Sequence, residues 1–181
     1  FGITESKINV VYNGIDSIFF ESDRGTPLNL PEKYLLFVGG MYGRKNFAAL
    51  QMAVEKLRQQ GNFDYELVII GPREKFYYEE TDLNLEEPYV HHLGFVSQSE
   101  LKYAYTNADI FVFPSLYEGF GLPPLEAMAS GTPVVASNQP CVPEILGDAA
   151  HFVDPRNVNS IAGGIETVIS DPDYREDLRK R

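Results

Sequence analysis

The chain has 181 residues, of which 44% are hydrophobic and 23% are charged, a balance that is typical of a folded domain and excludes a disordered tail. Its net charge of −11, with no basic stripe, excludes a nucleic-acid-binding surface. The single cysteine, Cys141, excludes an intramolecular disulfide and a zinc site built from paired cysteines. No run approaches the roughly 18 apolar residues that span a bilayer, and no signal segment opens the sequence. The chain starts at Phe1 and stops within a charged run, so we expect it to be a piece of a longer protein.

Four short runs are almost wholly apolar, namely residues 35–38, 67–70, 110–113 and 133–136. None of them alternates apolar with polar residues, so each is predicted to be a strand buried on both faces, as in a parallel sheet. Glycine or proline follows three of the runs closely, which is typical of a turn after a strand.

Helical patterns lie between and after these runs. Apolar residues at helical spacing predict a helix from Phe47 to Leu57, and Ser97 with Glu100 matches a capping box before a second helix. Further helices are predicted over residues 123–130, 143–146, 158–170 and 173–180. Residues 74–88 are polar and aperiodic, so we interpret them as a surface loop or an irregular helix. The alternation of strands and helices predicts one doubly wound α/β domain, with its ligand at the carboxyl ends of the strands.

The stretch 114–135 carries the most informative polar residues. Glu118 and Glu126 flank a Gly-Phe-Gly turn that runs into a predicted helix. Such a turn lets backbone N–H groups approach a phosphate or a sugar closely, so both carboxylates are candidates to face one ligand crevice. An alternative stays open, in which Glu126 complements the helix dipole and Glu118 is a solvated loop residue.

A second stretch, residues 36–47, places Arg44 and Lys45 at the start of a predicted helix, shortly after Gly39 and Gly40. Cations at a helix N-terminus oppose the helix dipole and cost about 0.3–1 kcal/mol each. A bound diphosphate would explain a pair of them there. In the alternative interpretation both side chains extend into water; we favour the diphosphate, because two glycine-rich turns follow two of the buried strands.

Other polar residues are better explained by structure. His91 and His92 have no further ligand at metal-site spacing, so we predict a strand-edge or loop role for them. Asp171 and Asp173 lie between two predicted helices, where capping explains them, and Asp109 precedes a buried strand. We therefore predict no metal site.

Taken together, these motifs resemble the C-terminal domain of family 4 glycosyltransferases, which have the two-domain GT-B architecture. The paired-Glu motif from Glu118 to Glu126, followed by Ala-Met-Ala-x-Gly-Thr-Pro-Val-Val, is the strongest element. The matching segments, in order, are residues 8–19, 37–46, 90–97, 118–126, 143–147 and 153–155. The resemblance implies a Rossmann-like, mostly parallel sheet, with residues 1–19 as an interdomain junction and residues 20–181 as the donor-binding domain.

The resemblance also implies retaining transfer of a hexose from a nucleotide diphosphate sugar. Arg44 and Lys45 would neutralise the departing diphosphate, so that no divalent metal or other cofactor is required. Glu118 would hold hydroxyls of the donor sugar, and Glu126 would accept hydrogen bonds from the ribose hydroxyls. The remaining donor-binding residues implied by the family pattern are Gly39, Gly40, Phe95, Val96, Gly119, Phe120, Gly121 and Leu122, with Phe95 and Val96 facing the base.

The sequence departs from the family pattern at Gly40, where many members have an arginine, so donor affinity is expected to be lower. The acceptor site belongs to the N-terminal domain of the family, which is the expected partner in the same chain. These residues alone are therefore expected to bind donor without turnover. The complete enzyme is expected to be cytoplasmic. Any association with the inner face of the membrane would come through the N-terminal domain. The motif style points to mannose, with GDP-mannose as donor. Two alternatives remain, a nucleotide-sugar epimerase of the same architecture and a non-catalytic nucleotide-binding module.

Overall fold

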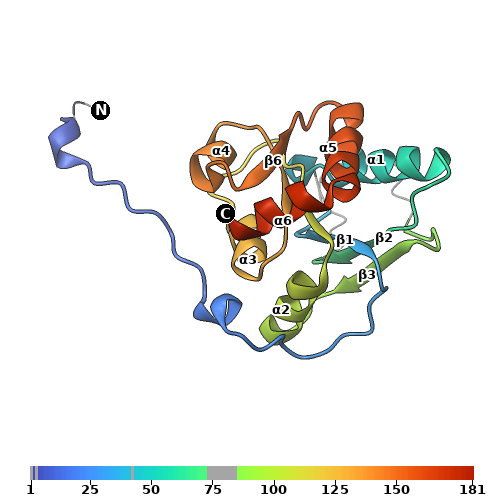
Figure 1. Cartoon of the computed structure of the whole chain (residues 1–181). Helices are drawn as coiled ribbons and strands as arrows, with labels where there is room; N and C mark the ends of the chain where they lie inside the picture. The colour runs from blue at the N-terminus through green and yellow to red at the C-terminus, as the bar shows by residue number, and fades with distance from the viewer. Residues whose placement is uncertain (1, 3, 42, 73–84) are drawn as a thin grey trace.

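A parallel sheet forms the centre of the molecule (Figure 1). It has six strands, in the order β3-β2-β1-β4-β5-β6. The computed structural model describes residues 2, 4–41, 43–72 and 85–181. The strands are β1 (Tyr34–Val38), β2 (Glu66–Ile70), β3 (Val90–Gly94), β4 (Ile110–Phe113), β5 (Val134–Ser137) and β6 (Ala150–Val153). The helices are α1 (Phe47–Gln59), α2 (Gln98–Asn107), α3 (Leu122–Ala129), α4 (Cys141–Leu146), α5 (Val158–Ser170) and α6 (Pro172–Lys180), with 3-10 turns η1 (Glu5–Lys7), η2 (Ser17–Phe20) and η3 (Gly43–Lys45).

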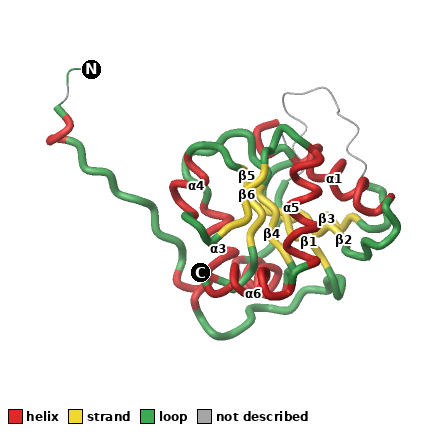
Figure 2. The backbone as a smooth tube through the Cα atoms, turned by 45° about the horizontal axis from the view of Figure 1, so that its top comes forward, coloured by secondary structure: helices red, strands yellow, loops and turns green. Residues whose placement is uncertain are grey.

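Two helical layers cover the two faces of the sheet, as the second view in Figure 2 also shows. Leu35 and Phe37 of β1 pack in one core with α1, α5 and α6, whereas Tyr34 and Leu36 pack in the other with η2, α2, α3 and α4. Because successive side chains of a strand point to opposite faces, a strand buried on both sides must be apolar at every position. The continuous apolar runs in the sequence have this cause.

The strand order reverses at β1, which pairs with β2 on one side and with β4 on the other. Such a reversal is a topological switch point, because the connections that leave the neighbouring strands run to opposite sides of the sheet. The loops after β1 and β4 therefore border the position where doubly wound sheets bind ligands.

The four predicted strands are confirmed as parallel strands, and the predicted helices match α1 to α6 to within about two residues at their ends. Ser97 caps α2 in the predicted capping box with Glu100. The apolar-run criterion missed β3 and β6, which lie at the two edges of the sheet. Edge strands are only partly buried and tolerate polar residues such as His91 and His151. Residues 74–84 of the predicted surface loop lie outside the described residues, whereas residues 85–88 form turns.

The segment before β1 begins far from the sheet and then packs against it. Its first part extends away from the body in Figure 1 and exposes Val10 and Val11. Phe19 in η2 is buried, and its ring lies edge-on to Tyr105 with centroids 5.8 Å apart. The predicted junction at residue 19 stays a prediction. Across the described part of the chain, no helix is both long and apolar enough to cross a membrane.

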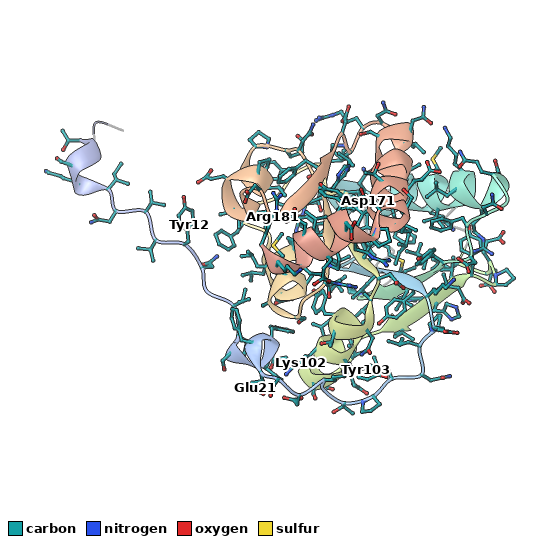
Figure 3. The ribbon with its side chains drawn as sticks, viewed as in Figure 1. Tyr12, Glu21, Lys102, Tyr103, Asp171 and Arg181 are labelled. Atoms are coloured by element: carbon teal, nitrogen blue, oxygen red, sulfur yellow. The ribbon has the colours of Figure 1, made fainter. Side chains whose placement is uncertain are left out.

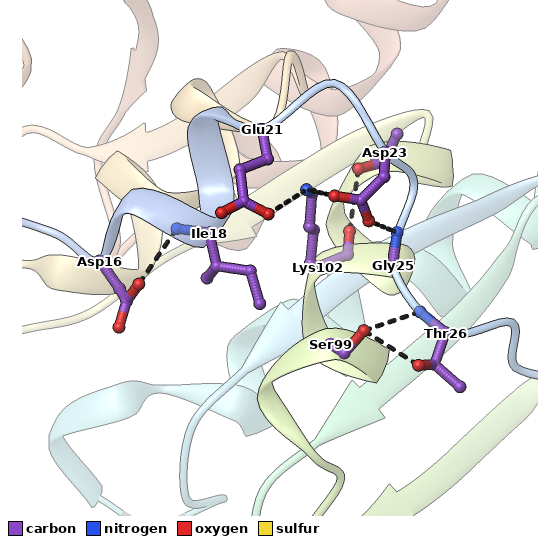
Figure 4. A network of polar contacts seen from close by, with 9 residues as sticks. Asp16, Ile18, Glu21, Asp23, Gly25, Thr26, Ser99 and Lys102 are labelled. Atoms are coloured by element: carbon purple, nitrogen blue, oxygen red, sulfur yellow. Dashed lines mark hydrogen bonds and ion pairs between the residues drawn. The ribbon is translucent and has the colours of Figure 1, made fainter.

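A polar network fixes residues 21–26 to α2 (Figures 3 and 4). The Lys102 side chain is 1% exposed, and its Nζ lies 3.0 Å from Asp23 Oδ2 and 4.0 Å from Glu21 Oε2. Beside it, the Thr26 N–H donates to Ser99 Oγ at 3.0 Å. A Cβ on Gly25 would stand 2.2 Å from the Ser99 carbonyl oxygen, so only glycine allows this close approach of the backbones.

The network predicts that two substitutions of its ion pair lower the stability of the fold by different amounts. Asp23→Asn leaves the buried Lys102 ammonium without its closest counter-charge, whereas Lys102→Met removes the buried charge itself and keeps most of the packing. We expect Asp23→Asn to lower the urea midpoint of unfolding more than Lys102→Met does. An equal or opposite order of the two midpoints would contradict the structural role assigned to this ion pair.

Candidate functional site

Two loops meet at the carboxyl ends of β1 and β4, where the strand order reverses. The Leu116 N–H in the second loop donates to the Arg44 carbonyl oxygen in the first at 2.8 Å. Asn46 holds the same junction, because its Nδ2 donates to the carbonyl oxygens of Pro114 at 3.0 Å and Pro155 at 2.7 Å. Asn46 is also the N-cap of α1, in the left-handed conformation that asparagine tolerates better than most residues. Arg44 and Lys45 are thereby fixed in η3, immediately before α1.

Glu118 lies between the two cations and joins the two loops. Its Oε2 accepts from Arg44 Nη1 at 2.7 Å, and its Oε1 lies 2.8 Å from Lys45 Nζ. Glu118 is 9% exposed and Lys45 is 8% exposed, whereas the Arg44 side chain is 45% exposed. The Lys45 ammonium also lies 5.1 Å from the ring centroid of Phe113, so an aromatic face covers the buried charge.

The electrostatics of this triad, Arg44, Lys45 and Glu118, favour the ionised carboxylate. Burial by itself raises the pKa of Glu118, but the hydrogen bond and the positive charge of Lys45, with the hydrogen bond from Arg44, outweigh burial and hold the pKa below its usual value. The solvated-loop interpretation of Glu118 is therefore wrong, and so is the interpretation in which Lys45 extends into water. Glu118 is the counter-charge of both cations, and this pairing offsets their unfavourable position before α1 without any bound anion.

Two glycines bring Lys45 and the turn after β1 close together. Gly39 has φ 142°, and a Cβ on it would lie 3.5 Å from Lys45 Cε. A Cβ on Gly71, at the end of β2, would stand 2.4 Å from the Gly39 carbonyl oxygen. The adjacent Gly40 is buried. The predicted role of Gly39 and Gly40 in donor binding stays a prediction.

The turn after Glu118 leads into α3. Gly121, the N-cap, has φ 105°, a conformation that disfavours any residue with a side chain. Pro123 and Pro124 in the first turn carry no N–H, so the amides available to a ligand at this end of α3 belong to residues 119–122. Gly119, Phe120 and Leu122 are exposed or half-buried there.

Glu126 lies on α3, where it faces α2. Its Oε2 accepts a hydrogen bond from the Tyr105 hydroxyl at 3.0 Å. Burial raises the pKa of Glu126 above its usual value; the Tyr105 hydrogen bond acts in the opposite direction, and the negative charge of Asp16 adds to the rise. The described contacts bring Arg44, Lys45 and Glu118 together, and none of them joins Glu126 to this triad. The hypothesis of one crevice shared by the two carboxylates stays a prediction.

Phe95 and Val96 follow β3, so they lie at the same edge of the sheet as the triad. Phe95 is 84% exposed and Val96 is half-buried. Their predicted contact with a nucleotide base stays a prediction.

Two side chains that make contacts in this region, Asn46 and Tyr105, have no site role predicted from the sequence. The sequence places Asn46 directly after Arg44 and Lys45, and Tyr105 within the second predicted helix. The signal for Asn46 was its place between two cations and a helix start; Tyr105 gave no signal, because its partner Glu126 is 21 residues away.

The structural roles predicted for the other polar residues are confirmed. His92 Nε2 lies 2.8 Å from the Gly71 carbonyl oxygen, and His91 pairs with Glu66. Asp171 caps α6 through the Tyr174 N–H, and Asp109 accepts from the Tyr34 N–H. Among the described residues, no group of three or more His, Cys, Asp or Glu side chains could hold a metal ion.

The sequence of this chain matches a family model and several known proteins. The family model described as "Glycosyl transferases group 1" matches residues 19–181. The O-antigen chain mannosyltransferase B of Escherichia coli is 38% identical over 146 residues, which are 79% of this chain and 38% of that protein. The O-antigen chain mannosyltransferase RfbU of Salmonella typhimurium is 33% identical over 177 residues, 96% of this chain and 47% of that protein. The chain therefore spans half or less of the length of these relatives.

Solved structures have the same fold. The C-terminal domain of a glycosyl transferase group 1 family protein from Francisella tularensis superposes with a TM-score of 0.73 at 27% identity, covering 92% of this chain and 93% of that one. A glycosyltransferase from Rickettsia africae superposes with a TM-score of 0.78 at 22% identity, over 98% of this chain and 50% of that one. The predicted α/β fold, with its parallel doubly wound sheet, is confirmed.

The raised pKa of Glu126 predicts how stability depends on pH. A carboxyl whose pKa is higher in the folded state stabilises that state as long as it stays protonated. This stabilisation is lost as the pH rises from the ordinary glutamate range through the raised pKa. We expect Glu126→Gln, which mimics the protonated form, to raise the melting temperature by a few degrees at pH 7 and by nothing at pH 3.5. A variant less stable than the parent at pH 7 would contradict this account.

Proposed function

The chain belongs to the glycosyl transferases group 1 family, and from this premise we propose that it is the nucleotide-sugar-binding domain of a retaining hexosyltransferase. The sugar is mannose and the donor is GDP-mannose, in the synthesis of a polysaccharide or glycoconjugate. The mannosyltransferase names of its relatives support this choice of sugar. Transfer itself requires an acceptor-binding domain beyond these residues.

The triad of Arg44, Lys45 and Glu118 at the switch point carries the proposal. A leaving nucleoside diphosphate gains negative charge as its bond to the sugar breaks, and two fixed cations stabilise that charge in the transition state. Lys45 is held in place by burial and by the Phe113 ring, so little reorganisation is needed when the charge develops. Arg44, which is more exposed, adds a planar guanidinium suited to phosphate oxygens. Two cations in this position take the role of a divalent metal, so we propose metal-independent transfer.

The remaining donor contacts follow from the loops around the triad. Glu118 accepts hydrogen bonds from hydroxyls of the donor sugar, and the amides of Gly119, Phe120, Gly121 and Leu122 line the sugar and the phosphates. Glu126 accepts hydrogen bonds from the two ribose hydroxyls, since an ionised carboxylate accepts and never donates. Glu126 is half-buried and accepts a hydrogen bond from Tyr105, so a diol that also donates to it would offset part of the cost of its burial.

The other domain supplies the acceptor site, and the complete enzyme is placed in the cytoplasm, peripheral to the inner face of the membrane through that domain. This division of roles means that the present chain binds donor without turnover. It has no role for nucleic acid, in line with its net charge of −11.

Calorimetric titration without divalent metal tests the proposal. The chain is titrated with GDP, UDP and ADP and with their common sugar conjugates, and the same titrations are made on Lys45→Ala and Glu126→Ala. We expect one nucleotide to bind, and each substitution to weaken binding about tenfold or more, because each removes a charge-assisted contact.

Two surface substitutions serve as matched controls. Lys33→Ala removes a half-exposed lysine just before β1, at the opposite edge of the sheet, and Glu166→Ala removes an exposed glutamate on α5. Both should leave the affinity unchanged. Absence of binding by every nucleotide, or equal binding by Lys45→Ala and Lys33→Ala, would contradict the proposal. The products formed by the complete protein separate transfer from epimerisation, and absence of any product favours a non-catalytic module.

A further inference from the structure

The Tyr105 hydroxyl points from α2 to the Glu126 carboxylate on α3. We propose that Tyr105 is a positioning residue that holds the Glu126 carboxylate in the orientation needed to receive two ribose hydroxyls. The inference rests on the proposed function for the identity of the ligand, whereas the Tyr105–Glu126 bond itself is observed at 3.0 Å.

The Tyr105 ring is held on several sides. Tyr105 is fully buried, and its ring lies edge-on to Phe19 at 5.8 Å and to Phe111 at 5.5 Å between centroids. Its backbone carbonyl oxygen accepts a hydrogen bond from Thr132 Oγ1, just before β5. The phenol oxygen is therefore fixed relative to the sheet, so it can hold the Glu126 carboxylate that it contacts in one orientation.

The orientation of the Glu126 carboxylate depends on a fixed hydrogen-bond partner. The last torsion of a glutamate side chain has a broad, two-fold profile, so a carboxylate without a fixed partner rotates over many orientations. One bond to Oε2 fixes the plane of the carboxylate and leaves Oε1, with the second lone pair of Oε2, for a diol. Affinity gained by fixing a group before the ligand arrives is the usual effect of preorganisation.

The direction of the bond is also settled. Burial raises the pKa of Tyr105 well above its usual value, with the charge of Glu126 acting in the same direction, so the phenol keeps its proton and donates it. In the described part of the chain, the titratable groups that act on Glu126 are Tyr105 from α2 and Asp16 from the turn before η2. Loss of the Tyr105 bond would leave only burial and the Asp16 charge, both of which favour the protonated carboxyl.

Tyr34 provides a matched control for this residue. It is 1% exposed, it packs in the same core as Tyr105, and its hydroxyl donates to the Ala104 carbonyl oxygen at 2.7 Å. Tyr34→Phe and Tyr105→Phe each remove one buried hydroxyl and keep the ring. Only the second removes a hydrogen bond to Glu126.

The first test needs no ligand. Carbon-13 NMR of the labelled Glu126 carboxyl gives its pKa in the parent chain and in the two variants. We expect Tyr105→Phe to raise this pKa and Tyr34→Phe to leave it unchanged. A Glu126 pKa that is the same in Tyr105→Phe and in the parent overturns the proposal, whatever the binding data.

The second test is calorimetric titration of the same variants with GDP, UDP and ADP. Tyr105→Phe should weaken binding of the preferred nucleotide about tenfold at pH 7. It should also raise the pH below which the nucleotide no longer binds. Tyr34→Phe should change neither quantity. If Tyr105→Phe binds like the parent while Glu126→Ala does not, the positioning role is wrong and the proposed function stands. If Glu126→Ala itself binds like the parent, the ribose contact in the proposed function fails, and the positioning role with it.

Discussion

The contact between one buried carboxylate and two cations organises this domain. Glu118 accepts a hydrogen bond from Arg44 at 2.7 Å and forms an ion pair with the Lys45 ammonium at 2.8 Å, at the place where the strand order reverses. Removing charges from water is costly, and replacing a buried ion pair with well-packed apolar residues is often neutral or stabilising. Stability alone therefore gives no reason to keep three charges here. Their arrangement is explained if a ligand with negative charge shares the two cations with Glu118.

The surrounding structure depends on this contact through the two loops that it joins. Asn46 donates to the loop after β4 and to the loop before α5. Gly71 lets the ends of β1 and β2 come close together, and the Lys45 side chain lies beside Gly39. The segment before β1 reaches the same region from the other side, where η2 packs on α2 and α3 next to Tyr105 and Glu126. The two acidic residues thus have different environments: cations hold the pKa of Glu118 low, whereas burial raises that of Glu126.

The central strands and the helices were predictable because their physical signals are local. A strand covered on both faces must be apolar throughout, and Ser97 with Glu100 marks the start of α2 within four residues. The edge strands β3 and β6 were not predicted, because a partly buried strand does not need a continuous apolar run. Motifs in the sequence single out Arg44, Lys45 and Glu118 as candidates, but they do not predict the pairing of these residues. Arg44 and Glu118 are 74 residues apart, and the topology of the sheet brings them together. The positions of Tyr105 and Asn46 depend on the same long-range packing.

The most direct test of the account compares two ligands on Glu118→Gln. Calorimetry gives the affinity of the chosen nucleoside diphosphate and of its sugar conjugate for this variant and for the parent chain. If Glu118 and the diphosphate share Arg44 and Lys45, removing the carboxylate charge should raise the affinity for the free diphosphate severalfold. It should also reduce the preference for the conjugate, because a sugar contact is lost. An affinity for the free diphosphate that stays the same or falls would show that Glu118 only joins the two loops, and would contradict the account.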